Sequence, residues 1–157
     1  MKTKQRRRGP VYSVMDLETT GTSFKNGDRI IQIGLVLIQD GKVINQFETR
    51  INPLMKIPRS VQQLTGITDK DVAKAPFLDD VAQTVESLLS GTIFVAHNVN
   101  FDFPFLNHEL ERVGRDPLRI TAIDTVTLSQ ILMPTAKSYR LRDLTNYLHI
   151  EHDHPHS

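Results

Sequence analysis

Between residues 11 and 51 the chain carries three segments rich in β-branched and other apolar residues. They are residues 11–17, 29–38 and 42–51, and Asp40-Gly41 separates the last two. Asp-Gly between two apolar strands is a strong hairpin signal, because both residues tolerate the positive φ angles of a type I′ turn. The sequence therefore predicts an antiparallel meander of three strands in this part of the chain.

The rest of the chain alternates between helical and strand-like patterns. The predicted elements are short helical pieces at residues 60–64 and 69–73, a helix from Pro76 to the stop at Gly91, a strand at 92–96, a helix from about 101 to 113, a strand at 120–123, and helices at 125–132 and 139–148. This order predicts an α/β domain with a five-stranded mixed sheet, in which three strands are antiparallel and two are parallel. The ribonuclease-H-like fold is the candidate that fits it.

Composition limits the chemistry of any site. The chain has 157 residues and no cysteine, which excludes disulfides, thiolate metal sites and a cysteine nucleophile. A metal ion would have to bind oxygen or imidazole ligands, and carboxylate-rich sites suit Mg²⁺ or Mn²⁺ better than zinc. No apolar run reaches the roughly 18 residues that a membrane helix needs, so we expect a cytoplasmic protein without a membrane partner.

The charge is locally uneven although the net charge is only +1. Residues 1–10 form a basic arm, and residues 11–157 form the predicted domain. The arm could touch phosphates, but a solvated tail is the more common role of such a charge run. We therefore argue no function from it.

The first predicted strand ends in two carboxylates, Asp16 and Glu18. Side chains two apart on a strand leave the same face, with Cα atoms roughly 6–7 Å apart. Because buried unpaired charge is strongly disfavoured, a divalent cation between them would fit; the alternative is that the strand simply leaves the core for a turn. The motif continues through Gly21, which permits a tight backbone, while Thr19 and Thr20 offer hydroxyls and amides beside the carboxylates.

A second polar segment, HNVNFD at residues 97–102, follows the strand at 92–96 and ends in Asp102 at the start of a helix. Taken alone, an acid there is more often an N-cap or a first-turn residue that the helix dipole favours. His97 alone is likewise more often a hydrogen-bonded structural residue. Phe101 has two readings, core packing or an aromatic face for a base.

Together, DLETTG at residues 16–21 and HNVNFD at 97–102 resemble the first two motifs of the DEDDh family of 3′–5′ exonucleases, which includes the proofreading epsilon-type subunits. LTGIT at 64–68 is similar to the family segment beside the terminal nucleotide, and AIDT at 122–125 to its usual strand end. The resemblance covers nearly the whole chain. The ending resembles most the exonuclease domain of DinG-type helicases, and next that of PolC-type polymerases.

The resemblance implies a ribonuclease-H-like enzyme that removes nucleoside monophosphates from the 3′ end of single-stranded DNA with two Mg²⁺ or Mn²⁺ ions, as part of a larger helicase or polymerase. By the same resemblance Asp16, Glu18 and Asp102 are the metal ligands and His156 is the general base. The implied substrate-binding residues are Thr19, Thr20, Gly21, Leu64, Thr65, His97, Asn98 and Phe101.

The family places its last aspartate five positions after the histidine base. With His156 as the base, that aspartate falls at position 161, after Ser157, so we expect the last helix of the family outside these residues. His152 or His154 as the base also finds no aspartate at that spacing, and the histidine-rich tail could instead be a solvated terminus. Two alternatives stay open: a weak or silent nucleic-acid-binding module, and an RNA-trimming exonuclease. Asp124 and Asp143 are expected at helix starts rather than as ligands.

Overall fold

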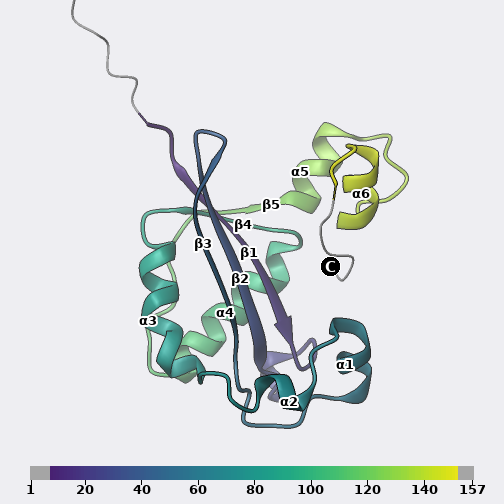
Figure 1. The fold of residues 1–157 in the computed structure, drawn as a ribbon. Helices are drawn as coiled ribbons and strands as arrows, with labels where there is room; N and C mark the ends of the chain where they lie inside the picture. The colour runs from purple at the N-terminus through teal and green to yellow at the C-terminus, as the bar shows by residue number, and fades with distance from the viewer. Residues whose placement is uncertain (1–7, 152–157) are drawn as a thin grey trace, which may run out of the picture.

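The computed structural model describes residues 8–151 of the chain. It contains a five-stranded sheet in the order β3-β2-β1-β4-β5 (Figure 1). The strands are β1 (Val11–Thr19), β2 (Ile30–Gln39), β3 (Lys42–Arg50), β4 (Ile93–Ala96) and β5 (Ala122–Asp124). β2 pairs antiparallel with both β1 and β3, whereas β4 pairs parallel with both β1 and β5. The predicted mixed sheet is thus confirmed.

The hairpin between β2 and β3 turns at the predicted dipeptide. Gln39 pairs with Lys42, and the two residues between them have φ angles of 51° at Asp40 and 74° at Gly41. Positive φ at both central residues is the requirement of a type I′ turn, whose twist matches that of the flanking strands. The local sequence therefore fixes the register of this edge of the sheet.

All the predicted helices are present. They are α1 (Arg59–Thr65), α2 (Asp69–Val72), α3 (Leu78–Leu89), α4 (Val99–Arg112), α5 (Thr125–Leu132) and α6 (Leu141–Tyr147), with a 3-10 turn η1 (Phe24–Asn26) before β2. Figure 1 shows α3 and α4 together along one side of the sheet, with α5 and α6 grouped away from them.

Five predicted boundaries were wrong by two residues, among them the end of β1 at Thr19 and the start of α3 at Leu78. α4 begins at Val99 rather than near Phe101, because a carboxylate from β5 binds the first amides of the helix. β5 begins at Ala122 rather than at residue 120, since its ladder with β4 starts at the pair Phe94–Ala122. α6 begins at Leu141 rather than at residue 139, because the extended Arg140 precedes it. The other ends differ by one residue or agree, as is usual for boundaries.

The main core lies between the sheet and the helix pair α3 and α4. On β1 the buried positions are Ser13, Met15 and Leu17, and the helices contribute Val85 and Phe105. Successive strand residues point to opposite faces. Burial of Met15 and Leu17 therefore turns Asp16 and Glu18 to the other face of the sheet.

A smaller apolar cluster holds α1 and α2 to the sheet. It consists of Ile31 on β2 together with Ile57, Ile67 and Val72. All four are buried, so the segment that contains α1 is fixed beside the start of β2. Among the helices of residues 8–151, none is both long and apolar enough to cross a membrane.

Candidate active site

The end of β1 extends beyond its parallel neighbour. β4 pairs with β1 only at residues 12–14, so the amides farther along this edge of β1 lack a strand partner. The first turn of α4 supplies one, because the Leu17 amide donates to Asp102 Oδ1 at 3.2 Å. This bond places the buried Asp102 next to the strand segment that carries Asp16 and Glu18.

The three carboxylates influence one another electrostatically. Burial raises the pKa of Asp102 to about 7, and the charge of Asp16 adds to the rise, while the bond from the Leu17 amide opposes it. Burial also raises the pKa of Glu18 to about 7, again with a contribution from Asp16. The pKa of Asp16 itself is raised by burial, although its side chain still reaches solvent. The three residues therefore share one region of uncompensated negative charge.

The chemistry of these donors fits a hard divalent cation. Within residues 8–151 none of the three carboxylates forms an ion pair, and carboxylate oxygens are the ligands that Mg²⁺ and Mn²⁺ prefer. The carboxylates are near one another but not preassembled: among those same residues, no three acidic or histidine side chains converge closely enough to hold a metal ion. Binding would therefore require their side chains to turn toward a common point.

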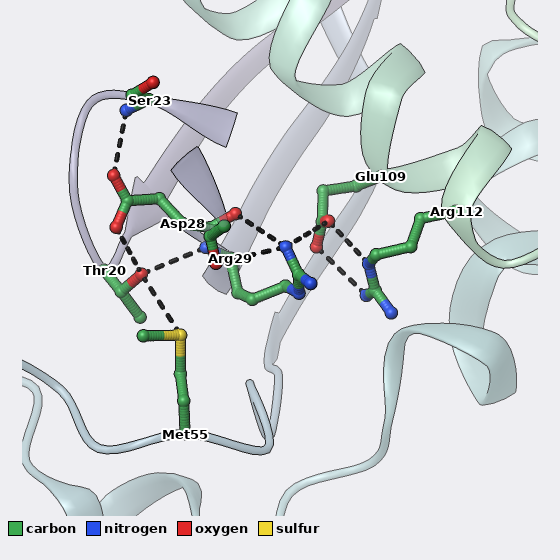
Figure 2. A network of polar contacts seen from close by, with 8 residues as sticks. Thr20, Ser23, Asp28, Arg29, Met55, Glu109 and Arg112 are labelled. Atoms are coloured by element: carbon green, nitrogen blue, oxygen red, sulfur yellow. Dashed lines mark hydrogen bonds and ion pairs between the residues drawn. The ribbon is translucent and has the colours of Figure 1, made fainter. Parts of the chain in front are cut away.

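The loop after β1 is held by Thr20 and Asp28 (Figure 2). The Thr20 hydroxyl donates to Asp28 Oδ1 at 3.1 Å and accepts the Arg29 amide at 3.0 Å. Gly21 leaves room for this carboxylate, since a Cβ there would lie 2.6 Å from Asp28 Cγ. Thr20 is 1% exposed, so its hydroxyl supports the loop and is not presented at the surface.

The other predicted nucleotide-gripping residues differ in what they expose. The Thr19 hydroxyl donates to the Gly21 carbonyl at 2.6 Å, and the Thr65 hydroxyl donates to the Val61 carbonyl at 2.9 Å. Leu64 on α1 is 77% exposed. Among these three residues, Leu64 is the one that offers free apolar surface.

His97 joins three segments of the chain. Its Nδ1 lies 2.9 Å from Thr125 Oγ1, and its Nε2 lies 2.9 Å from the Tyr139 carbonyl. Because a carbonyl oxygen only accepts, Nε2 must carry the hydrogen. Both ring nitrogens are therefore used within the protein. This agrees with the alternative in which His97 is a hydrogen-bonded structural residue.

Asp124 organises the start of two helices. Its Oδ1 accepts the amides of Asn98 at 2.9 Å and Val99 at 3.1 Å, and its Oδ2 accepts the Thr127 amide at 3.1 Å. Partial burial alone would raise the pKa of Asp124, but the bonds from Thr127 and the amides lower it to about 2. The prediction of a helix-start residue is confirmed for Asp124, which is the N-cap of α5, and for Asp143, which lies in the first turn of α6.

Phe101 packs on the main core, with its ring centroid 5.4 Å from that of Phe105. The packing alternative therefore accounts for part of this ring. The ring also remains partly exposed, so the second reading, contact with a base, is compatible with its position. His156 lies outside the described residues.

A known protein family matches most of the chain. The family model described as Exonuclease, RNase_T, matches residues 13–157, which include all of the carboxylates discussed above. The chain belongs to this exonuclease family. Members of the family and of this fold generally use divalent metal ions, in keeping with the oxygen-rich donors of β1 and α4.

Individual members of the exonuclease family are close in sequence. The chain is 42% identical over 145 residues to a Bacillus subtilis protein named 3′-5′ exonuclease DinG, covering 92% of the chain and 16% of that protein. It is 36% identical to a Clostridium perfringens protein named DNA polymerase III PolC-type, covering 92% of the chain and 10% of that protein. The chain thus spans only a small part of the length of these relatives.

Solved exonuclease structures share the fold. An E. coli exonuclease I structure, a zinc-bound complex with single-stranded DNA, superposes with a TM-score of 0.82 at 22% identity, covering 95% of this chain and 37% of that one. At this identity the likeness establishes the fold, and it confirms the ribonuclease-H-like prediction.

An apolar groove lies beside the candidate active site of this exonuclease domain. It has a volume of about 500 Å³ and is lined by Val14 and Val36 of the sheet, by Leu144 on α6 and by Leu148 just after that helix. Asp16 is among its lining residues. Sequence periodicity did not predict this groove, because α6 is too short to show which of its faces meets the sheet.

Proposed function

We propose that this domain hydrolyses phosphodiester bonds from the 3′ end of single-stranded DNA with two Mg²⁺ or Mn²⁺ ions. The observation that carries the proposal is the set of coupled, unpaired carboxylates of Asp16, Glu18 and Asp102, drawn from β1 and α4 to one region. The exonuclease family supports the reaction class. The direction is supported by the name of the DinG relative, and the substrate by the DNA in the exonuclease I complex.

In this proposal the three carboxylates hold the ions, with Asp102 bound to β1 through the Leu17 amide. Two bound ions would supply a nucleophilic water and stabilise negative charge on the leaving 3′ oxygen. His156 would accept a proton from the attacking water in its neutral form, and an unperturbed histidine is mostly neutral above a pH of about 6.5. The product is a nucleoside monophosphate.

The terminal nucleotide lies between the end of β1 and α1. Leu64 supplies exposed apolar surface, and the exposed part of Phe101 faces a base or sugar. Thr19 is the last residue of β1, and Thr65 is the last residue of α1. The other predicted substrate-binding residues contribute indirectly, because they set the path of the backbone around the site. These are Thr20 and Gly21 in the loop after β1, and His97 and Asn98 before α4.

The domain works as part of a larger helicase or polymerase protein in the cytoplasm. The support is the length of the relatives, of which the chain spans 16% and 10%, and the polymerase name of one of them. Nothing in residues 8–151 favours the silent-module or the RNA-trimming alternative over this proposal, and the experiment below separates both from it.

The test is digestion of a 5′-labelled single-stranded DNA oligonucleotide and its RNA counterpart in Mn²⁺. We expect a ladder of labelled products that shortens with time from the 3′ end, with DNA degraded faster than RNA. A 3′-terminal phosphorothioate on the DNA should slow the first step. Immediate release of the labelled 5′ mononucleotide would contradict the direction, preferential loss of RNA would favour the trimming alternative, and binding without cleavage would favour the silent module.

A further inference from the structure

α4 carries two buried acids on one face. Asp102 and Glu109 are seven residues apart, which is two helical turns or about 10 Å along the axis. They are 5% and 1% exposed, respectively. Asp102 is one of the proposed metal ligands. Glu109 lies away from the three carboxylates and takes no part in the proposed chemistry.

Glu109 is held by two arginines. Arg112 binds it with both arms of the guanidinium, with Nε donating to Oε1 at 2.7 Å and Nη2 donating to Oε2 at 3.1 Å. Arg29 Nη1 lies 3.7 Å from Oε1 and forms a second ion pair. Arg112 alone would neutralise the carboxylate within the helix, so the pair with Arg29 adds a connection between α4 and another part of the chain.

Arg29 in turn holds the end of β1 (Figure 2). Its amide donates to the Thr20 hydroxyl at 3.0 Å, and its carbonyl accepts the Thr20 amide at 2.8 Å. Its guanidinium also donates to the carbonyls of Gly27 at 3.1 Å and Asp28 at 3.2 Å. One residue therefore joins the loop after β1, the start of β2 and α4.

The two elements that carry the proposed metal ligands are thus connected at two points, one direct and one through Arg29, which precedes β2 and binds Thr20 just after β1. One is the Leu17–Asp102 hydrogen bond at the start of α4, and the other is the Arg29–Glu109 ion pair two turns later. Core packing of Phe105, Leu106 and Leu110 holds α4 against the sheet, and the two polar connections add directional contacts at both ends of the segment from Asp102 to Glu109.

We propose that Glu109 is a positioning residue. Through Arg29 it fixes α4 against the end of β1, and so sets the place of Asp102 relative to Asp16 and Glu18. This inference rests on the proposed function, because it assigns to the ion pair the alignment of the proposed metal ligands. Apolar residues can often replace a whole buried ion pair without loss of stability, whereas removal of one partner is destabilising, so the test has to separate positioning from stability.

The test compares Glu109→Gln with the wild-type chain by titrating Mn²⁺ and following the free ion by electron paramagnetic resonance. The amide keeps the volume and loses the charge that attracts Arg29. We expect the apparent Kd for Mn²⁺ to rise about tenfold, in the range seen when residues that orient metal ligands are changed. In the nuclease assay kcat should fall while the KM for the oligonucleotide stays the same.

Two controls separate positioning from general loss of stability. Glu86→Gln on α3 makes the same acid-to-amide change in a 3.4 Å ion pair with Arg115, which follows α4. Val85→Ala weakens the core at a fully buried position. Both should keep the wild-type Mn²⁺ affinity, even where Val85→Ala lowers Tm. If Glu109→Gln does not fold, Arg29→Lys is the second variant. It keeps the positive charge but loses the several N–H donors of the guanidinium, so it should raise the Kd for Mn²⁺ by a smaller factor.

Wild-type Mn²⁺ affinity in a folded Glu109→Gln variant would overturn the positioning role and leave the proposed function standing. Weakened Mn²⁺ binding in Val85→Ala to the same extent would also overturn it, because affinity would then follow stability. Failure of the wild-type chain to bind Mn²⁺ at all would overturn the proposed function and this inference with it.

Discussion

At the scale of single residues, Asp102 is a carboxylate kept where its charge is poorly tolerated. Burial and the charge of Asp16 raise its pKa to about 7, above the value near 3.9 of an unfolded aspartate. Between these two pH values the folded chain binds more protons than the unfolded chain. The metal-free protein should therefore lose stability as pH rises through this window.

Asp102→Asn should stabilise the metal-free protein at pH 8. The amide oxygen still accepts the Leu17 amide, but no charge is buried, so the free energy of unfolding should increase by roughly 1–3 kcal/mol. The difference should shrink toward pH 4, where the wild-type carboxyl is largely protonated. Urea unfolding in EDTA at both pH values checks this, and a variant less stable than wild type at pH 8 would show that the Asp102 charge is offset in the folded chain.

Glu18 and Asp16 should contribute to the same loss of stability with rising pH, because burial raises their pKa values as well. The sequence showed the order and spacing of these carboxylates, and strand alternation correctly placed two of them on one face. The hydroxyl of Thr20 could not be assigned in that way. Its partner Asp28 is eight residues away, in a loop whose path is set by tertiary contacts and by the space at Gly21.

At the scale of elements, the start of α4 is set from outside the helix. Asp124 at the end of β5 accepts the amides of Asn98 and Val99, and Asn98 takes the left-handed φ of 75° before the helix. A pattern-based boundary near Phe101 misses this, because the capping carboxylate comes from 25 residues farther along the chain. The same carboxylate caps α5, which local sequence does predict.

Asp124→Ala should weaken both helix starts. A lost N-cap typically lowers the free energy of unfolding by about 0.5–2 kcal/mol, and we expect the upper part of that range at pH 7 because two helices are affected. The pKa of Asp124 is lowered to about 2, so its contribution is present above pH 4 and lost as pH falls toward 2. The difference from wild type should shrink over that interval.

Chemical unfolding at pH 7, 4 and 2.5 measures this difference. Asp143→Ala is the matched control, since Asp143 is also a first-turn acid but its carboxylate accepts from Ser138 within the same segment. A loss for Asp124→Ala no larger than for Asp143→Ala at pH 7 would contradict the double-capping role.

At the scale of the whole molecule, the sheet and its helices were predictable because their signals are local: alternation in β1 to β3, the Asp40-Gly41 turn, and helical spacing from Leu78 to Leu89. The ties between elements were not. Arg29 and Glu109 are distant in sequence and meet only after the sheet has formed, and His97 uses a backbone carbonyl that no motif can specify. The carboxylates of the candidate site could therefore be proposed from the sequence. The contacts that align them could not.

In the proposed function, Asp16, Glu18 and Asp102 together support metal-dependent cleavage. The most direct measurement is release of mononucleotides from 3′-labelled single-stranded DNA in Mn²⁺, Mg²⁺ or EDTA, with wild type, Asp16→Asn and the control Asp143→Asn. We predict release by wild type and Asp143→Asn in either metal, none in EDTA, and none by Asp16→Asn. Release in EDTA, or release by Asp16→Asn at the wild-type rate, would contradict this role of the carboxylates.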